Sequence, residues 1–191
     1  MYQPLITFCP HPAIFTQVLR IFVVMKKVGI LSDTHGYWDD RYITHFDGCD
    51  IILHAGDVGD YAIVERLRSI CPVVAVCGNA DGGEVRRKCR ELEIFDIEGV
   101  KVLLTHIGGY PGKWRPGMKR LLSENSIKLM VDGHSHILKV IYDSDLALLH
   151  INPGAAGQQG WHRVRTLVRL VVDGSDMRDC EIIELSRFSE I

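Results

Sequence analysis

Short apolar runs alternate along the chain with amphipathic or turn-rich segments. In the first half, runs at residues 28–31, 50–55 and 72–77 predict strands, because each is short and is followed by Ser, Gly, Asp or Asn. Apolar side chains recur with helical spacing over residues 61–70, and residues 37–46 are expected to be helical or irregular. Strand–helix–strand order with short connections predicts parallel strands joined by right-handed crossovers.

The second half consists of apolar runs separated by turns of Gly, Asp and Ser. Residues 93–97 and 101–105 predict a hairpin, and a loop rich in Gly and Pro at 108–117 leads into a predicted helix at 118–124. Further strands are predicted at residues 128–131, 138–142, 146–151, 165–172 and 180–185. This pattern favours a mostly antiparallel closing half. No repeat, low-complexity tract or linker interrupts the chain after Met25.

The first 24 residues do not follow this pattern, since prolines precede an apolar run that Arg20 divides. This run is shorter than the ~18 apolar residues that a membrane helix needs. The segment also lacks the basic start and small-residue cleavage site of a signal peptide. We therefore expect residues 1–24 to be an extension or the product of a mis-assigned start, and residues 25–191 to form a single domain. Removing residues 1–24 is expected to leave folding and activity intact.

Composition narrows the functional classes. The chain has 191 residues, of which 47% are apolar and 24% are charged, as in globular domains with a sizeable core. A formal net charge of −2 predicts neither bulk nucleic-acid binding nor binding to an acidic membrane. The cysteines lack C-x-x-C spacing and several lie beside apolar runs, which indicates buried thiols in a reducing compartment. A cytoplasmic location is therefore expected.

Side chains that bind metals stand where the apolar runs end. Asp33 and His35 follow the first predicted strand, two positions apart. On an extended backbone such residues project from the same face, so a carboxylate and an imidazole can converge. His134 and His136 repeat this spacing. The full set at these strand ends is Asp33, His35, Asp57, Asn79, His106, His134 and His136.

The functional crevice of an open α/β sheet lies at the carboxyl ends of its strands, which is where these side chains occur. Any one of them would also fit an ordinary turn or helix cap. Together they predict a metal site, and a single metal would leave ligands over. Two divalent metals that share one carboxylate are therefore expected.

Five motifs in a fixed order resemble those of the calcineurin-like metallophosphoesterases: Asp33-x-His35, Gly56-Asp57, Gly78-Asn79, Thr105-His106 and Gly133-His134-x-His136. The compact length and Asn152-Pro153-Gly154 resemble the small YfcE-like branch. The resemblance runs from about Met25 to the C-terminus. It implies the metallophosphatase fold of class α/β, a four-layer α-β-β-α sandwich of two mixed β-sheets.

The resemblance also implies a division of the ligands between two metals: Asp33, His35 and His136 on the first, Asn79, His106 and His134 on the second, and Asp57 bridging both. Manganese is favoured, with iron, zinc, nickel or cobalt as alternatives for such a set. Two cations ~3.5–4 Å apart can lower the pKa of a bridging water, whose hydroxide attacks phosphorus in line. The expected enzyme is a phosphodiesterase acting on a small phosphate ester, with Asp57, Asn79 and His106 as its catalytic residues.

The sequence departs from the family pattern after the motif's Asn, where many relatives carry a His that is a candidate acid for the leaving oxygen. Here that position is Ala80, so activated phosphodiesters are expected to react better than alkyl phosphomonoesters. Asp81 is either a substitute acid or a turn or cap residue.

A second departure is Ile107-Gly108, where relatives commonly place Gly and then His. The loop that follows is expected to shape the substrate mouth. Within it, Lys113 or Arg115 either contacts a phosphate oxygen or belongs to a solvated basic loop.

Several other residues are expected to be structural. His54 and His150 lie within apolar runs and are expected to be hydrogen-bonded core residues or supports for neighbouring ligands. Trp161 is expected to pack rather than to stack on a base, and His162 has no ligand-like spacing.

Two other functions compete with the phosphodiesterase. The small retromer subunit resembles this fold and is mainly a docking surface with a degraded metal site. A protein-interaction scaffold with vestigial catalysis is therefore the alternative. All the ligand positions here keep metal-competent side chains, which favours the enzyme. A nuclease would need a basic groove that the composition does not indicate. The physiological substrate and the oligomeric state are left open, with a homo-oligomer among the alternatives.

Overall fold

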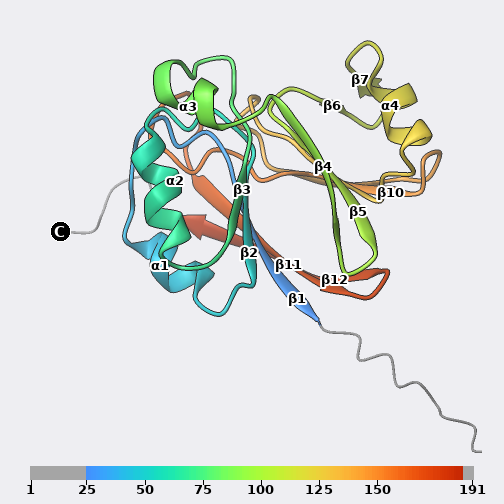
Figure 1. The fold of residues 1–191 in the computed structure, drawn as a ribbon, viewed down its shortest axis with the longest axis horizontal. Helices are drawn as coiled ribbons and strands as arrows, with labels where there is room; N and C mark the ends of the chain where they lie inside the picture. Colours follow the sequence, from blue (N-terminus) through green and yellow to red (C-terminus); the bar gives the residue numbers. More distant parts are fainter. Residues whose placement is uncertain (1–24, 187–191) are drawn as a thin grey trace, which may run out of the picture.

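Two five-stranded sheets pack face to face in the computed structural model, which describes residues 25–186 (Figure 1). The N-terminal extension expected at residues 1–24 lies outside the described residues. The first sheet has the order β12-β11-β1-β2-β3. Its strands are β1 (Lys26–Leu31), β2 (Ile51–His54), β3 (Val73–Ala75), β11 (Arg165–Asp173) and β12 (Asp176–Leu185).

The second sheet has the order β4-β5-β8-β10-β9. Its strands are β4 (Leu92–Ile97), β5 (Val100–Thr105), β8 (Leu129–Val131), β9 (Lys139–Asp143) and β10 (Leu148–Asn152). The hairpin predicted from residues 93–105 is the antiparallel pair β4–β5.

Strand direction confirms the expected pairing except at β8. β1, β2 and β3 are parallel, as the strand–helix–strand pattern predicted. In the second half, β4–β5, β9–β10 and β11–β12 pair antiparallel, as expected, whereas β8 is parallel to both β5 and β10. α4 (Met118–Glu124) lies between β5 and β8, and β9 lies between β8 and β10. Each of these connections brings the chain back to the starting end of the sheet, so the next strand can pair in parallel.

Helices cover the outer faces of both sheets. α1 (Arg41–Phe46), α2 (Tyr61–Arg68) and α3 (Gly83–Lys88) bury Phe46, Leu67 and Val85 in one apolar cluster at the first sheet. α4 buries Met118 and Leu122 against the second sheet. A third cluster fills the space between the sheets. The architecture is therefore the α-β-β-α sandwich that the resemblance implied.

One helix and one short hairpin were not predicted. α3 has six residues and only Val85 buried, so it leaves no apolar periodicity to detect. The two-stranded hairpin of β6 (Gly109–Tyr110) and β7 (Lys113–Trp114) lies in the segment expected as a loop. Among the described helices, none is long and apolar enough to cross a membrane.

The described cysteines are free thiols. Cys49, Cys77 and Cys89 are buried and Cys71 is half-buried, in line with their predicted packing role. Burial raises the pKa of each of these thiols, to about 11 for Cys71. Cys180 is exposed and does not fit that prediction.

Candidate metal centre

The polar side chains expected at strand ends lie at one edge of the two packed sheets. Asp33 and His35 follow β1 and Asp57 follows β2, so parallel pairing of these strands brings the three residues together. His106 follows β5 and His134 follows β8, which are parallel neighbours in the second sheet. A hydrogen bond joins the sheets at this edge, because His134 N–H donates to Asp33 Oδ2 at 3.1 Å.

The loops that carry these side chains have an unusual backbone conformation. Residues with positive φ include Asp33 (55°), His35 (47°), Asp57 (50°), His134 (66°) and His136 (56°). The extended backbone expected for Asp33-x-His35 is therefore wrong, and the side chains converge from left-handed turns instead. Such a conformation costs an L-residue about 1–2 kcal/mol. Hydrogen bonds between the two loops hold it, from Asp33 N–H to Gly56 O at 3.0 Å and from His35 N–H to Asp57 O at 2.9 Å.

Glycines let these loops approach the side chains of Asp57 and His106 closely. A Cβ on Gly78 would collide with the carboxylate of Asp57, and a Cβ on Gly56 would lie 2.7 Å from His106 Nδ1. The glycines that precede Asp57 and Asn79 in the motifs are thus required by packing around the site.

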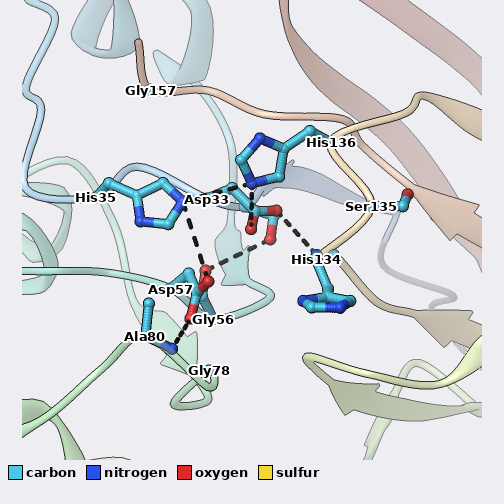
Figure 2. A network of polar contacts seen from close by, with 12 residues as sticks. Asp33, His35, Gly56, Asp57, Gly78, Ala80, His134, Ser135, His136 and Gly157 are labelled. Atoms are coloured by element: carbon cyan, nitrogen blue, oxygen red, sulfur yellow. Dashed lines mark hydrogen bonds and ion pairs between the residues drawn. The ribbon is translucent and has the colours of Figure 1, made fainter. Parts of the chain in front are cut away.

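Asp33, His35 and His136 form a first group, whose potential ligand atoms all lie within 4.8 Å of one another. His136 Nε2 is 3.2 Å from Asp33 Oδ1 and 3.4 Å from His35 Nε2. Figure 2 shows these three side chains and the Asp57 carboxylate pointing toward a common centre. Asp33 is fully buried, whereas the two histidines are partly exposed.

Asp57, His106 and His134 form a second group with the same spacing. His106 Nδ1 donates to Ala55 O at 2.7 Å, since a carbonyl can only accept. In the neutral ring, Nε2 therefore presents a lone pair, and it lies 3.3 Å from Asp57 Oδ2. Two acceptors face each other at this point, so a proton or a metal cation must lie between them.

The buried polar atoms fit a divalent metal. Within residues 25–186, Asp33 Oδ1 and His106 Nε2 are buried and lack a well-formed hydrogen bond; they face only other potential metal ligands, His136 Nε2 and Asp57 Oδ2. An unsatisfied buried polar atom costs about 1–3 kcal/mol, so native proteins rarely keep one without a ligand. One such atom belongs to each group, and carboxylate oxygen and imidazole nitrogen are both ligands of divalent transition metals.

Comparison with known protein families identifies the class of proteins in which this site occurs. Residues 25–175 match the calcineurin-like phosphoesterase superfamily domain. The chain belongs to this superfamily. A probable metallophosphoesterase of Methanocaldococcus jannaschii is 34% identical over 136 residues, which cover 67% of each chain. Another, from Methanothermobacter thermautotrophicus, is 30% identical over 82% of this chain and 91% of its own length.

Solved structures of the same fold include wild-type Vps29 of Entamoeba histolytica in complex with zinc. It superposes with a TM-score of 0.65 at 17% identity, over 85% of this chain and 99% of its own. At this identity the likeness shows the fold alone. It agrees with the sandwich of two mixed sheets described above.

The side chains of the two groups shift one another's pKa values. Burial lowers the pKa of His106, but the Asp57 carboxylate, the charge of Asp33 and the Ala55 carbonyl together outweigh it, and the pKa is raised overall. The contact with the Asp33 carboxylate raises the pKa of His136 in spite of burial. Burial would raise the pKa of Asp57, yet contacts with His106 and with the Ala80 N–H, which donates at 2.8 Å, lower it. Protons and metal ions therefore compete for the same nitrogen atoms.

Asn79 lies in the turn after β3 and, unlike Asp33, Asp57 and His106, is not buried. Its side chain is exposed and lines a hollow of about 200 Å³ together with His106, Arg86 and Arg115. Arg86 is held by Gly78 O at 2.9 Å and by other acceptors, whereas no ion pair engages Arg115 within residues 25–186. Of the two basic residues expected near a phosphate, Arg115 thus lines the site, and Lys113 does not line this hollow.

Asp81 has a structural role. Its carboxylate accepts the backbone N–H groups of Val58 at 3.1 Å, Gly59 at 2.7 Å and Gly78 at 2.8 Å. These bonds tie the loop after β2 to the loop after β3. The turn-residue alternative is therefore the correct one, because the oxygens that a general acid would need are occupied.

His54 is a hydrogen-bonded core residue, as expected. Gly56 N–H donates to its Nδ1 at 3.2 Å, so Nε2 carries the proton and donates to Thr34 Oγ1 at 2.9 Å. The Thr34 hydroxyl in turn donates to Val58 O at 3.0 Å. Burial lowers the pKa of His54 to about 4, which keeps the ring neutral.

His150 supports the other side of the site. Asp132 Oδ1 lies 3.0 Å from both His150 Nε2 and Asn152 Nδ2. Asn152 also donates to Gly133 O, next to the ligand loop. These contacts fit the supporting role expected for His150.

Two expectations near His136 were wrong or incomplete. Trp161, expected to pack, is 100% exposed. His162 contacts the His136 ring edge-to-face, with centroids 5.5 Å apart, although its spacing in the sequence gave no signal. The loop between β10 and β11 brings it there, and only the tertiary structure shows this.

Proposed function

We propose that this protein is a binuclear metal-dependent phosphodiesterase. The observation that carries the proposal is the position of Asp57 between the two groups. Its Oδ2 lies 4.0 Å from His35 Nε2 of the first group and 3.3 Å from His106 Nε2 of the second. One carboxylate within reach of both groups suits a pair of metals that share a ligand.

The proposed ligands are those expected from the resemblance: Asp33, His35 and His136 for one metal, Asn79, His106 and His134 for the other, and Asp57 for both. Asn79 lines the same hollow as His106, which supports its place in the second set. Manganese is the proposed metal, with iron, zinc, nickel or cobalt as alternatives, because the set contains no thiolate.

Bound divalent metals would supply Lewis acidity, a nucleophile from water at neutral pH and neutralisation of charge on the phosphoryl group. The chain itself contributes the orientation of the ligands. The Nδ1–H of His106 is held by Ala55 O, and Asp57 Oδ1 is held by Ala80 N–H, so each presents its other atom to the centre.

The residues that follow Asn79 offer little means of donating a proton to the leaving oxygen. Ala80 carries no acidic proton, and the oxygens of Asp81 are occupied by backbone N–H groups. A missing general acid costs about 10²–10⁴-fold, mostly for poor leaving groups. Activated phosphodiesters should therefore be turned over faster than alkyl phosphomonoesters. Equal or faster hydrolysis of an alkyl monoester would contradict this expectation.

The alternative is a protein-interaction scaffold. The likeness to Vps29 concerns the fold and does not favour the scaffold over the enzyme. Two groups of metal-competent side chains and two unsatisfied buried atoms favour a site that binds metal. A docking surface alone would not require these features.

The decisive experiment measures hydrolysis of bis-p-nitrophenyl phosphate with Mn²⁺, then with a chelator, in the wild type and in Asp57→Asn. We expect chelation to abolish turnover and Asp57→Asn to reduce kcat/KM at least about 100-fold, because the shared carboxylate is lost. Asp60→Asn is the matched control. Asp60 caps α2 by accepting from Ala62 N–H, and asparagine can do the same.

The outcomes separate the two functions. Turnover that persists both with chelator and in Asp57→Asn would exclude the proposed mechanism. Inactivity on a broad panel of diesters, in a protein that binds two metals, would favour the scaffold.

A further inference from the structure

A fully exposed tryptophan stands beside the candidate metal centre. Trp161 is 100% exposed, and the neighbouring Ile137 is 59% exposed. A tryptophan offers a large apolar surface that a ligand can cover, and here the indole and Ile137 leave such surface open beside the centre. The position of this indole relative to Asp33 and His136 indicates what it could contact.

The loop that carries Trp161 is anchored on a proposed ligand at its start. Gly157 N–H donates to Asp33 O at 3.0 Å, and a Cβ on Gly157 would collide with Thr34 O. The loop is then closed on itself, because His162 Nε2–H donates to Gly157 O at 3.0 Å. Figure 2 shows Gly157 passing over the site.

The same loop touches a second proposed ligand on both sides of Trp161. Gly160 packs against the His136 ring so closely that a Cβ would collide with Nδ1. His162 meets the same ring edge-to-face. Trp161 lies between these two contacts in the sequence, so its backbone is held at a defined place next to His136.

The indole borders a hollow of about 440 Å³ that shares walls with the centre. Its lining includes His134, His136, Ile137 and Trp161. The hollow lined by Asn79 and His106 is different in character, since Arg86 and Arg115 line it. The candidate metal centre thus borders one hollow lined by two arginines and another in which Trp161 and Ile137 lie beside histidines.

We propose that Trp161 is a specificity-determining residue that stacks on a planar aromatic substituent of the phosphoester. The substituent occupies the hollow between Trp161 and Ile137 while the phosphoryl group lies at the metal centre. This inference rests on the proposed function and names its substrate class, aromatic phosphoesters. Aromatic rings prefer offset stacking on an indole, which an aliphatic group cannot reproduce.

The test compares the affinity of the Mn²⁺-loaded protein for phenylphosphonate and for methylphosphonate by isothermal titration calorimetry. Both carry the same anionic group, and neither can be hydrolysed at the P–C bond by this chemistry. The wild type should bind phenylphosphonate about tenfold more tightly. Trp161→Ala should lose this preference and keep its methylphosphonate affinity, whereas Trp161→Phe should retain most of the preference.

Tyr142→Ala is the matched control, because Tyr142 is also aromatic and is 64% exposed, on β9. It should leave both affinities unchanged. A phosphonate analogue of adenosine 5′-phosphate gives a third arm: loss of its affinity in Trp161→Ala would identify a nucleobase as a source of the ring, and loss for phenylphosphonate alone would identify simple aryl esters.

The titrations distinguish a failure of this inference from a failure of the proposed function. Metal-dependent binding of methylphosphonate without a preference for phenylphosphonate, or a preference that survives in Trp161→Ala, would overturn this inference and leave the phosphoesterase intact. Absence of any metal-dependent phosphonate binding would overturn both.

Discussion

At the residue scale, single contacts decide what each side chain can do. The Nδ1–H of His106 is held by a backbone carbonyl, so Nε2 faces the Asp57 carboxylate. The oxygens of Asp81 are taken up by backbone N–H groups, so a residue that resembled an acid in the sequence organises loops instead. Arg115, in contrast, forms no ion pair within the described residues, so its charge remains available to an anionic substrate.

We therefore expect Arg115→Ala to lower kcat/KM for phosphodiesters about 10–100-fold, because a charge-assisted contact contributes about 1.5–3 kcal/mol. Lys113→Ala is the matched control, since Lys113 is a basic residue two positions before Arg115 and does not line this hollow. Kinetics on bis-p-nitrophenyl phosphate would measure both. Equal effects of the two substitutions would indicate a general attraction by a basic loop.

At the element scale, a buried ion pair secures the segment that follows the first ligands. Arg165 of β11 is fully buried and pairs with Asp39, which also pairs with Arg41. Arg165 donates to Ala156 O at 3.1 Å as well, in the loop after β10. The segment between β1 and α1 is thus fastened to the loop that precedes Trp161.

Replacing Asp39 should destabilise the fold. Asp39→Asn should lower the free energy of unfolding by about 3–5 kcal/mol at pH 7, because it leaves Arg165 buried without its charge partner. Asp40→Asn is the matched control, since that carboxylate is exposed and should matter little. Urea unfolding would measure both.

The same pair predicts a dependence on pH. Burial would raise the pKa of Asp39, but hydrogen bonds from Arg41 and Arg165 lower it well below its ordinary value. A lowered folded-state pKa stabilises the protein above the unfolded value, about pH 4, and the contribution is lost as the pH falls below it. The wild type should therefore lose stability more steeply than Asp39→Asn between about pH 4 and pH 2.

At the scale of the whole molecule, the centre joins the two sheets. Asp33, His35 and Asp57 come from the first sheet, whereas His106, His134 and His136 come from the second. A metal that binds both sets would oppose separation of the sheets on unfolding, because the unfolded chain does not hold the ligands together.

Mn²⁺ should therefore raise the Tm. At a concentration 100 times the Kd, binding contributes about 2.7 kcal/mol, which corresponds to about 5–10 °C for a domain of this size. The shift should shrink in acid, because contacts with Asp57 and Asp33 raise the pKa values of His106 and His136 and protons then compete with the metal. Differential scanning fluorimetry at several pH values would test this, and a shift that persists in Asp57→Asn would contradict the shared site.

The sequence by itself determined which side chains are available and which segments pair locally. Apolar runs predicted the strands, and Asp and His at their ends predicted a metal site, because strand periodicity and ligand chemistry are local properties. The tertiary structure alone decided that β8 pairs in parallel with β5 and β10, that left-handed turns bring Asp33 and His35 together, and that Trp161 faces solvent beside His136. These features depend on contacts between residues far apart in the chain, which no local pattern encodes.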